Sequence, residues 1–158
     1  MSPLPPDVRG MYFEEFEVGQ EFTTAGRTIT ESDIVTFAGL SGDYNQIHTD
    51  EEFCKTQPFG RRIAHGLLGL SIASGLAEQS GMMDGTIIAF REINNWKFVA
   101  PVFIGDTLHV VIKVLEAKEM HSVGGGLIVI ELDVRKQDKE TVMRGKWTAL
   151  IKSRDIER

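Results

Sequence analysis

Cysteine is almost absent from this 158-residue chain, which contains only Cys54. A single cysteine excludes an internal disulfide and any metal site built from several cysteines, and it fits a reducing compartment. The residues just before it, Asp50-Glu51-Glu52-Phe53, are mostly acidic and disfavour a thiolate. We therefore expect Cys54 to have a packing or incidental role and not to act as a nucleophile.

Long apolar runs and an excess of positive charge are also missing. No window offers the roughly 20 apolar residues that a membrane-spanning helix needs, and the N-terminus has no cationic segment followed by an apolar one. We expect no membrane partner, no secretory signal and a location in the cytoplasm or an organelle matrix. The formal charge of −6 argues against nucleic acid as a partner, because such binding depends on clustered Lys and Arg.

Proline is scarce, and three of the five prolines fall within the first six residues. Residues 1–11 show neither helical nor strand periodicity and are expected to form an N-terminal arm. The rest has ordinary composition for a globular protein, with 42% hydrophobic and 25% charged residues. With no internal repeat and no linker, residues 1–158 are expected to form one domain around one core.

Alternating and helical patterns predict the elements of this domain. We expect helices at about 31–40, 50–56 and 65–80. We expect strands at 21–29, 87–98, 107–117, 127–136 and 141–152, with a hairpin connection at Gly124-Gly125-Gly126. The architecture is therefore α+β, with an antiparallel sheet of about five strands wrapped around a long central helix.

The helix predicted at 65–80 has almost no polar face before Glu78. A helix that is apolar on every side must be surrounded, and a curved sheet is the expected surround. Each glycine in its interior costs up to ~1 kcal/mol relative to alanine. We therefore expect strands to pass close to the helix backbone and to compensate for these glycines.

A polar cluster precedes this helix, within the six residues from Asp43 to His48. A carboxylate and an imidazole form the commonest acid–base pair near neutral pH. Asp43 and His48 are five residues apart across a turn, so a folded loop can direct both side chains to one point. Asn45 between them can hold a water or brace the loop. The alternative is that Asp43 caps a helix, Asn45 makes a turn and His48 lies on the surface.

The step His65-Gly66 opens the long helix. The N–H of Gly66, with no side chain beside it, suits a carbonyl oxygen that gains negative charge, and the helix dipole assists. The alternative is that Gly66 only lets the helix begin in a crowded core. His65 either lines a substrate pocket or makes a structural hydrogen bond.

These residues resemble a known family, the MaoC-like dehydratases and R-specific enoyl-CoA hydratases, which have the hot-dog fold. The resemblance lies in the segment 37–48, FAGLSGDYNQIH, in Ile63-Ala64-His65-Gly66, and in the segment 101–108, PVFIGDTL. It extends over most of the chain from about Tyr12 to Ile151. One departure is Gln46, where the family usually has proline.

The resemblance implies that Asp43 and His48 activate water for addition to a trans-2-enoyl thioester, with Asn45 in support. It also implies that the Gly66 N–H binds the thioester oxygen, and that His65 and Gly66 contact the substrate. The reaction is (R)-specific hydration of an enoyl-CoA, or dehydration of an (R)-3-hydroxyacyl-CoA, without a metal or cofactor. The implied partners are an acyl-CoA or acyl carrier protein thioester and a second copy of the chain. A hot-dog thioesterase and a non-catalytic acyl-thioester binding subunit are the alternatives.

Overall fold

The computed structural model describes residues 10–154. The helices are α1 (Glu31–Ser41), α2 (Gln46–Thr49), α3 (Glu51–Cys54) and α4 (Gly66–Gln79), with short 3-10 turns η1 (Phe13–Glu15) and η2 (His121–Val123). The strands are β1 (Glu21–Thr23), β2 (Arg27–Thr28), β3 (Ile87–Phe98), β4 (Thr107–Met120), β5 (Gly125–Arg135) and β6 (Thr141–Lys152). Within the described range, no helix has the length and apolar character that crossing a bilayer requires.

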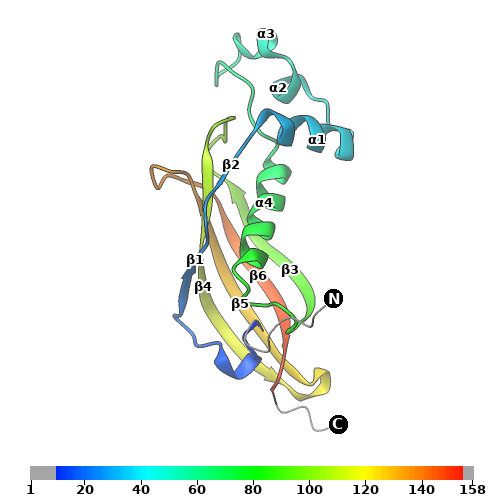
Figure 1. Cartoon of the computed structure of the whole chain (residues 1–158), viewed down its shortest axis with the longest axis vertical. Helices are drawn as coiled ribbons and strands as arrows, with labels where there is room; N and C mark the ends of the chain where they lie inside the picture. The colour runs from blue at the N-terminus through cyan, green and yellow to red at the C-terminus, as the bar shows by residue number, and fades with distance from the viewer. Residues whose placement is uncertain (1–9, 155–158) are drawn as a thin grey trace, which may run out of the picture.

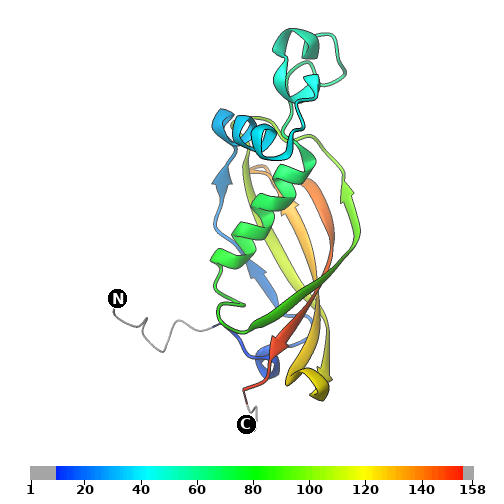
Figure 2. The same cartoon turned by 90° about the vertical axis from the view of Figure 1, so that its right-hand side faces the viewer.

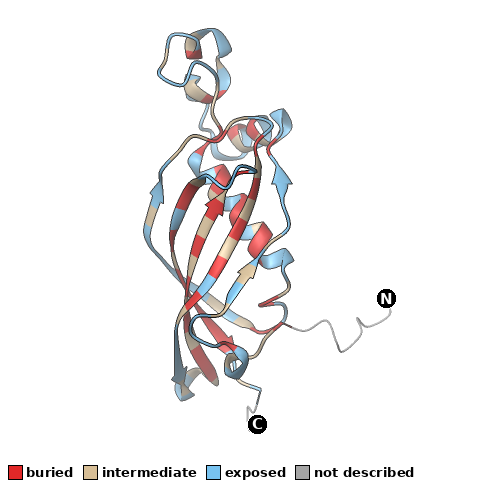
Figure 3. Ribbon diagram, turned by 90° about the vertical axis from the view of Figure 1, so that its left-hand side faces the viewer, coloured by how far each residue is buried: buried red, intermediate tan, exposed pale blue. Residues whose placement is uncertain are grey.

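The strands form one antiparallel sheet in the order β1-β4-β5-β6-β3, and β2 also pairs with β4. The sheet curves around α4, which lies along its concave side (Figures 1 and 2). This is the hot-dog arrangement that the sequence predicts. The alternation along β4 and β5 is confirmed, because their inward side chains are fully buried (Figure 3): Leu108, Val110, Ile112, Val114, Ile128, Ile130, Leu132 and Val134.

The sheet has six strands where about five were predicted, because the strand expected at 21–29 is split into β1 and β2. Thr24 lies at the break and replaces part of the backbone ladder with its side chain. Its hydroxyl oxygen accepts the Val110 N–H at 3.0 Å, and its own N–H donates to the Val110 carbonyl at 3.0 Å. A side chain that takes a backbone position in this way competes with regular strand pairing.

The predicted hairpin is displaced towards the N-terminus. The chain turns at η2 and at Gly124, which has φ 66°, while Gly125 and Gly126 already belong to β5. These two glycines serve close packing instead of the turn. A Cβ on Gly126 would overlap the ring of Phe13 from η1.

α4 is covered by its own chain on one side only, which corrects the expectation that it is surrounded. Its buried residues face the sheet: Leu68, Gly69, Ile72, Ala73, Leu76 and Ala77. On the other side Leu67, Ser71 and Ser74 are exposed. Close packing compensates at Gly69, where a Cβ would lie 2.6 Å from Cε of Met143, but among residues 10–154 nothing lies within 4 Å of a Cβ built on Gly75.

The helices α1, α2 and α3 gather at the end of the molecule where α4 begins (Figures 1 and 2). Helix α1 begins with a capping box, in which Asp33 N–H donates to Thr30 Oγ1 at 3.2 Å and Thr30 N–H donates to Asp33 Oδ2 at 2.8 Å. The helix expected at 50–56 is the shorter α3, and α2 was not predicted. In the fold, the N-termini of α2 and α4 lie together at this end of the molecule (Figures 1 and 2).

Residues 1–9 of the predicted arm lie outside the described residues. Gly10 and Met11, its last two positions, are held against the body of the protein. Their N–H groups donate to the carbonyls of Asp84 at 2.7 Å and Met82 at 2.9 Å. This part of the predicted arm is therefore packed, since both backbone donors find partners in the turn that follows α4.

Candidate active site

The loop from Asp43 to Asn45 is folded by its own side chains. Gly42 ends α1 with φ 77°, a left-handed conformation that glycine adopts readily. Asn45 N–H then donates to Asp43 Oδ1 at 3.2 Å, and Asn45 Oδ1 accepts the Ile47 N–H at 3.1 Å. Asn45 is thus the N-cap of α2 and braces the loop, while Asp43 keeps its other oxygen free to face His48.

His48 lies in α2 and is buried, with 6% of its surface exposed, so the alternative of a surface histidine is wrong. Its Nδ1 lies 2.7 Å from the carbonyl of Ile63. A carbonyl can only accept a hydrogen bond, so Nδ1 carries the proton and the neutral ring presents an unprotonated Nε2. That Nε2 lies 3.9 Å from Oδ2 of Asp43, a separation suited to a bridging water.

The environment of His48 keeps the imidazole neutral near pH 7. Burial lowers the pKa of His48, and the neighbouring His65 lowers it further, whereas the bond to Ile63 and the Asp43 carboxylate act in the opposite direction. The net pKa lies below the ordinary 6.5. A neutral His48 beside a half-exposed carboxylate can accept a proton from water and later return one.

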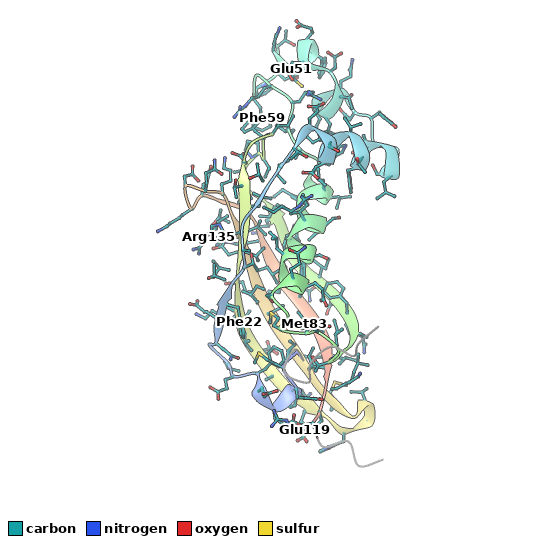
Figure 4. The ribbon with its side chains drawn as sticks, viewed as in Figure 1. Phe22, Glu51, Phe59, Met83, Glu119 and Arg135 are labelled. Atoms are coloured by element: carbon teal, nitrogen blue, oxygen red, sulfur yellow. The ribbon has the colours of Figure 1, made fainter. Side chains whose placement is uncertain are left out.

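Gly66 is the first residue of α4 and lines the same cavity as His48. Because the first amides of a helix have no intrahelical acceptor, the Gly66 N–H is available to a ligand. The cavity has a volume of about 510 Å³ and a mainly apolar lining that includes Phe59 and Phe98. A Cβ on Gly66 would lie 2.8 Å from the Phe98 ring, so any side chain here would strike the wall of the cavity. Phe59 lies beyond α3, at the same end of the molecule as Glu51 (Figure 4).

His65 is the N-cap of α4 and has 2% of its surface exposed. It is not among the residues that line the cavity. Its Nε2 lies 2.9 Å from the backbone carbonyl of Asp43, and its ring stacks on that of His48 with centroids 3.8 Å apart. Of the two uses the sequence suggested for His65, the structure contains the hydrogen bond.

Asp43, His48 and His65 could be taken for a metal site, since each offers a ligand atom within 4.8 Å of the others. Their geometry does not fit one. The two imidazole planes lie at 27° to each other in a stack, so their in-plane lone pairs run side by side and do not converge on one point. His48 Nδ1 and His65 Nε2 are moreover engaged with carbonyl oxygens. Among the described residues, this cluster is better suited to proton transfer than to holding an ion.

Arg62 is a supporting residue for which the sequence predicted no role in the site. Its guanidinium binds Glu31 at the start of α1 and Glu51 at the start of α3, with Arg62 Nε 3.0 Å from Glu51 Oε2. Nη1 also lies 3.5 Å from the carbonyl of His48. The two carboxylates raise the pKa of Arg62. Local sequence carries no signal for a contact 31 residues away.

Two sequence features of this region have a structural explanation. Cys54 is buried, and its thiol approaches the carbonyls of Gln46 and Ile47 at 3.5 and 3.4 Å. Burial raises the pKa of this thiol, in agreement with the predicted packing role. Gln46 occupies the first position of α2, where proline is tolerated because its N–H is not needed by the helix. Glutamine and proline therefore both fit the first position of α2.

The fold and this site together define a hot-dog domain with an acid–base cluster at the start of its central helix. The model of the MaoC like domain matches residues 14–133. The chain belongs to the MaoC-like dehydratase family.

Relatives and solved structures agree with this assignment. The chain is 39% identical over 111 residues to a 3-hydroxybutyryl-CoA dehydratase of Methylorubrum extorquens, covering 70% of this chain and 68% of the relative. It is 42% identical over 97 residues to an (R)-specific enoyl-CoA hydratase of Rhodospirillum rubrum, covering 61% and 65%. A structure described as a monoamine oxidase regulatory protein from Archaeoglobus superposes with a TM-score of 0.86 at 37% identity, covering 93% of this chain and 97% of that one. The match to Protein MaoC of Klebsiella aerogenes, 41% identical, spans 29% of that longer protein.

Proposed function

We propose that the protein catalyses (R)-specific hydration of trans-2-enoyl-CoA, and the reverse dehydration of (R)-3-hydroxyacyl-CoA. The observation that carries the proposal is the arrangement of three groups. His48 Nε2 and Asp43 Oδ2 are 3.9 Å apart, and His48 shares its cavity with Gly66 at the N-terminus of α4. The named activities of the two dehydratase and hydratase relatives support the same reaction class.

In the proposed reaction, a water lies between His48 Nε2 and the Asp43 carboxylate. Its oxygen forms a bond to the β-carbon of the enoyl thioester while one of its O–H bonds breaks. The proton passes to the acid–base couple, by which we mean His48 and Asp43. The π electrons of the C=C bond move towards the thioester carbonyl, whose oxygen becomes negative beside the Gly66 N–H. The enolate then collapses and the couple returns a proton to the α-carbon, which regenerates the site. A single such oxyanion donor contributes about 3 to 4 kcal/mol, and positioned acid–base groups about 100- to 10,000-fold in rate.

Asn45 supports this site from the loop, since it caps α2 and orients Asp43. No step of the proposed reaction uses a metal or a redox cofactor, because the thioester itself acidifies the α-proton. The cytoplasmic location stays a prediction from the sequence, and the carrier is either CoA or acyl carrier protein.

One assay separates the proposed reaction from its two alternatives. The protein is incubated with crotonyl-CoA, and loss of the enoyl absorbance is followed in parallel with release of free thiol. A hydratase removes the enoyl absorbance without thiol release and forms (R)-3-hydroxybutyryl-CoA, which chiral analysis identifies. A thioesterase releases thiol, and a binding subunit does neither. Thiol release, or an (S) product, would contradict the proposal.

We also propose that the protein forms a homodimer. Strand β3 pairs with β6 along one edge only, and several of its apolar side chains are exposed: Ile88, Phe90, Ile93 and Phe98. The outer side of α4 is open as well, with Leu67 60% exposed. A long apolar edge strand is a surface on which another chain can pair. Most soluble oligomers are homo-oligomers, and two-fold dimers are the commonest, so we expect the partner to be a second copy of this chain.

A further inference from the structure

His65 takes no part in the proposed reaction, although it contacts both Asp43 and His48. Its ring lies between those of Phe37 in α1 and His48 in α2, with centroid separations of 4.9 and 3.8 Å. Its backbone directly precedes Gly66, the proposed oxyanion donor. His65 therefore lies where α1, α2 and α4 meet, between the acid–base couple and the Gly66 N–H.

The hydrogen bond of His65 defines how it contacts the catalytic loop. Nε2 faces the carbonyl of Asp43 at 2.9 Å, so Nε2 carries the proton and donates. Among the described residues Nδ1 has no hydrogen-bond partner, although it is buried. The side chain is thus held by one directed bond and by the two ring contacts. A buried polar atom left without a partner is costly, which argues that the ring is kept here for a purpose other than stability.

We infer that His65 is a positioning residue of this active site. Its N–H to the Asp43 carbonyl and its stack on His48 set the acid–base couple at a fixed place relative to the Gly66 N–H. This inference rests on the proposed function. His65 acts through Asp43 and His48, because it does not line the cavity that holds the substrate. Misplacement of reacting groups by about 1 Å can cost roughly 100-fold in rate, so such an anchor matters for turnover.

Two variants that both carry a side-chain amide test the hydrogen bond from position 65 to the Asp43 carbonyl. In His65→Gln the side-chain amide nitrogen lies the same number of bonds from Cα as Nε2 of histidine, so it can still donate to the Asp43 carbonyl. In His65→Asn the amide is one carbon too short. We expect kcat on crotonyl-CoA to fall by about 10- to 100-fold in His65→Asn and by at least about fivefold less in His65→Gln, with KM changed less than about threefold in both. His121→Asn, on an exposed 3-10 turn, is the control and should leave both constants unchanged.

A titration tests the effect of the His65 imidazole on His48 independently of turnover. The charged or titratable groups around His48 are the neighbours Asp43 and His65 and, beyond its backbone carbonyl, the Arg62 cluster with Glu31 and Glu51. His65→Phe keeps a ring on His48 but removes the one neighbour that lowers the pKa of His48. NMR titration of the His48 imidazole should therefore give a higher pKa in His65→Phe than in the wild type.

The outcomes separate this inference from the proposed function. Equal kcat in the Gln and Asn variants, or a rise in KM alone, would overturn the positioning role, as would an unchanged titration of His48 in His65→Phe. Thermal melts verify that each variant is folded, and the Gln and Asn pair remains informative if His65→Phe is not. A wild-type protein that hydrates no enoyl-CoA would refute the proposed function, while the NMR result would still report the contact between the two rings.

Discussion

At the scale of single residues, the site is built from groups that are close in sequence and from others that are not. Asp43, Asn45 and His48 lie within six residues, so their spacing favoured a fold that directs Asp43 and His48 to one point, with a surface His48 as the alternative. The hydrogen bond from His65 to the Asp43 carbonyl spans 22 residues and depends on how α4 meets the loop. Sequence patterning could propose such a bond for His65 but could not identify its acceptor, because the tertiary fold decides it.

The lowered pKa of His48 gives a prediction for the pH dependence of the reaction. Burial is the largest cause, and the folded value lies below the ordinary 6.5. Since the neutral imidazole is the proposed base, activity is lost only when pH falls through this lowered value. We expect kcat/KM for crotonyl-CoA to keep more than half of its plateau at pH 6.5, because kcat/KM reports the free enzyme. An acid limb centred above pH 6.5 would mean that another group, or a charged His48, controls the rate.

The lowered pKa of His48 also predicts that the free energy of unfolding decreases at low pH. Unfolded His48 binds a proton near pH 6.5, whereas the folded residue binds it only at lower pH. Between these two values the unfolded state holds more protons, so the free energy of unfolding falls as the pH is lowered through this window. The wild type should therefore lose more stability between pH 7.5 and about 5.5 than His48→Gln does, as measured by urea denaturation. Parallel curves for the two proteins would contradict the burial of a neutral imidazole.

At the scale of elements, apolar periodicity predicted the bounds of the long strands well. It did not predict the places where a side-chain hydrogen bond interrupts or starts an element. Strands β3 and β6 have the predicted bounds, and β4 and β5 differ only at their ends. The break between β1 and β2 depends on the hydroxyl of Thr24, and α2 depends on the cap from Asn45. Both are local hydrogen bonds that compete with a regular pattern, and apolar periodicity does not report them.

Arg62 connects the helices around the loop, so its replacement tests whether this connection supports the site. Arg62→Met removes the contacts to Glu31, Glu51 and the His48 carbonyl. We expect a loss of about 1 kcal/mol in the free energy of unfolding, since the two carboxylates are half-exposed and such pairs are weak, and a fall in kcat of a few fold. Arg61→Met is the control, because Arg61 stacks on Phe103 and makes none of these contacts. Equal effects of the two substitutions would show that the Arg62 contacts do not support the loop.

Two glycines of α4 give a matched comparison of its inner and outer sides. Gly69→Ala forces the Met143 side chain to move, whereas Gly75→Ala meets no described atom within 4 Å. We expect Gly75→Ala to stabilise the protein by about 0.4 to 1 kcal/mol through reduced chain entropy in the unfolded state. Gly69→Ala should lose most or all of that gain. Urea unfolding measures both, and a destabilised Gly75→Ala would show that a second copy packs closely against α4 at this position.

At the scale of the whole molecule, the apolar helix and the alternating strands predicted a sheet wrapped around α4. Patterning alone did not predict that the outer side of α4 and the free edge of β3 stay open, whereas the hot-dog resemblance led us to expect both in a single domain. Those surfaces depend on what lies outside the chain, and hydrophobic patterning does not distinguish burial in the core from burial by a partner. The same open surfaces are the basis of the homodimer proposal.

The dimer proposal predicts the mass in solution. Light scattering of the purified protein should give twice the chain mass of 17.6 kDa. Ile93→Asp, in the exposed part of β3, should shift the mass towards the monomer because a buried unpaired charge is costly. Val18→Asp is the control, an exposed apolar residue in the turn before β1. A monomeric wild type at assay concentration would be inconsistent with the proposal.

The most direct test of the central claim is the kcat of Asp43→Asn and His48→Gln on crotonyl-CoA, with His121→Gln as the control. If Asp43 and His48 form the couple that activates water, each substitution should lower kcat by about 100-fold or more while the melting temperature changes little. The control should keep the wild-type rate. A folded Asp43→Asn or His48→Gln protein that turns over within about threefold of the wild type would contradict the account, since a couple that loses one member cannot retain its acid–base contribution.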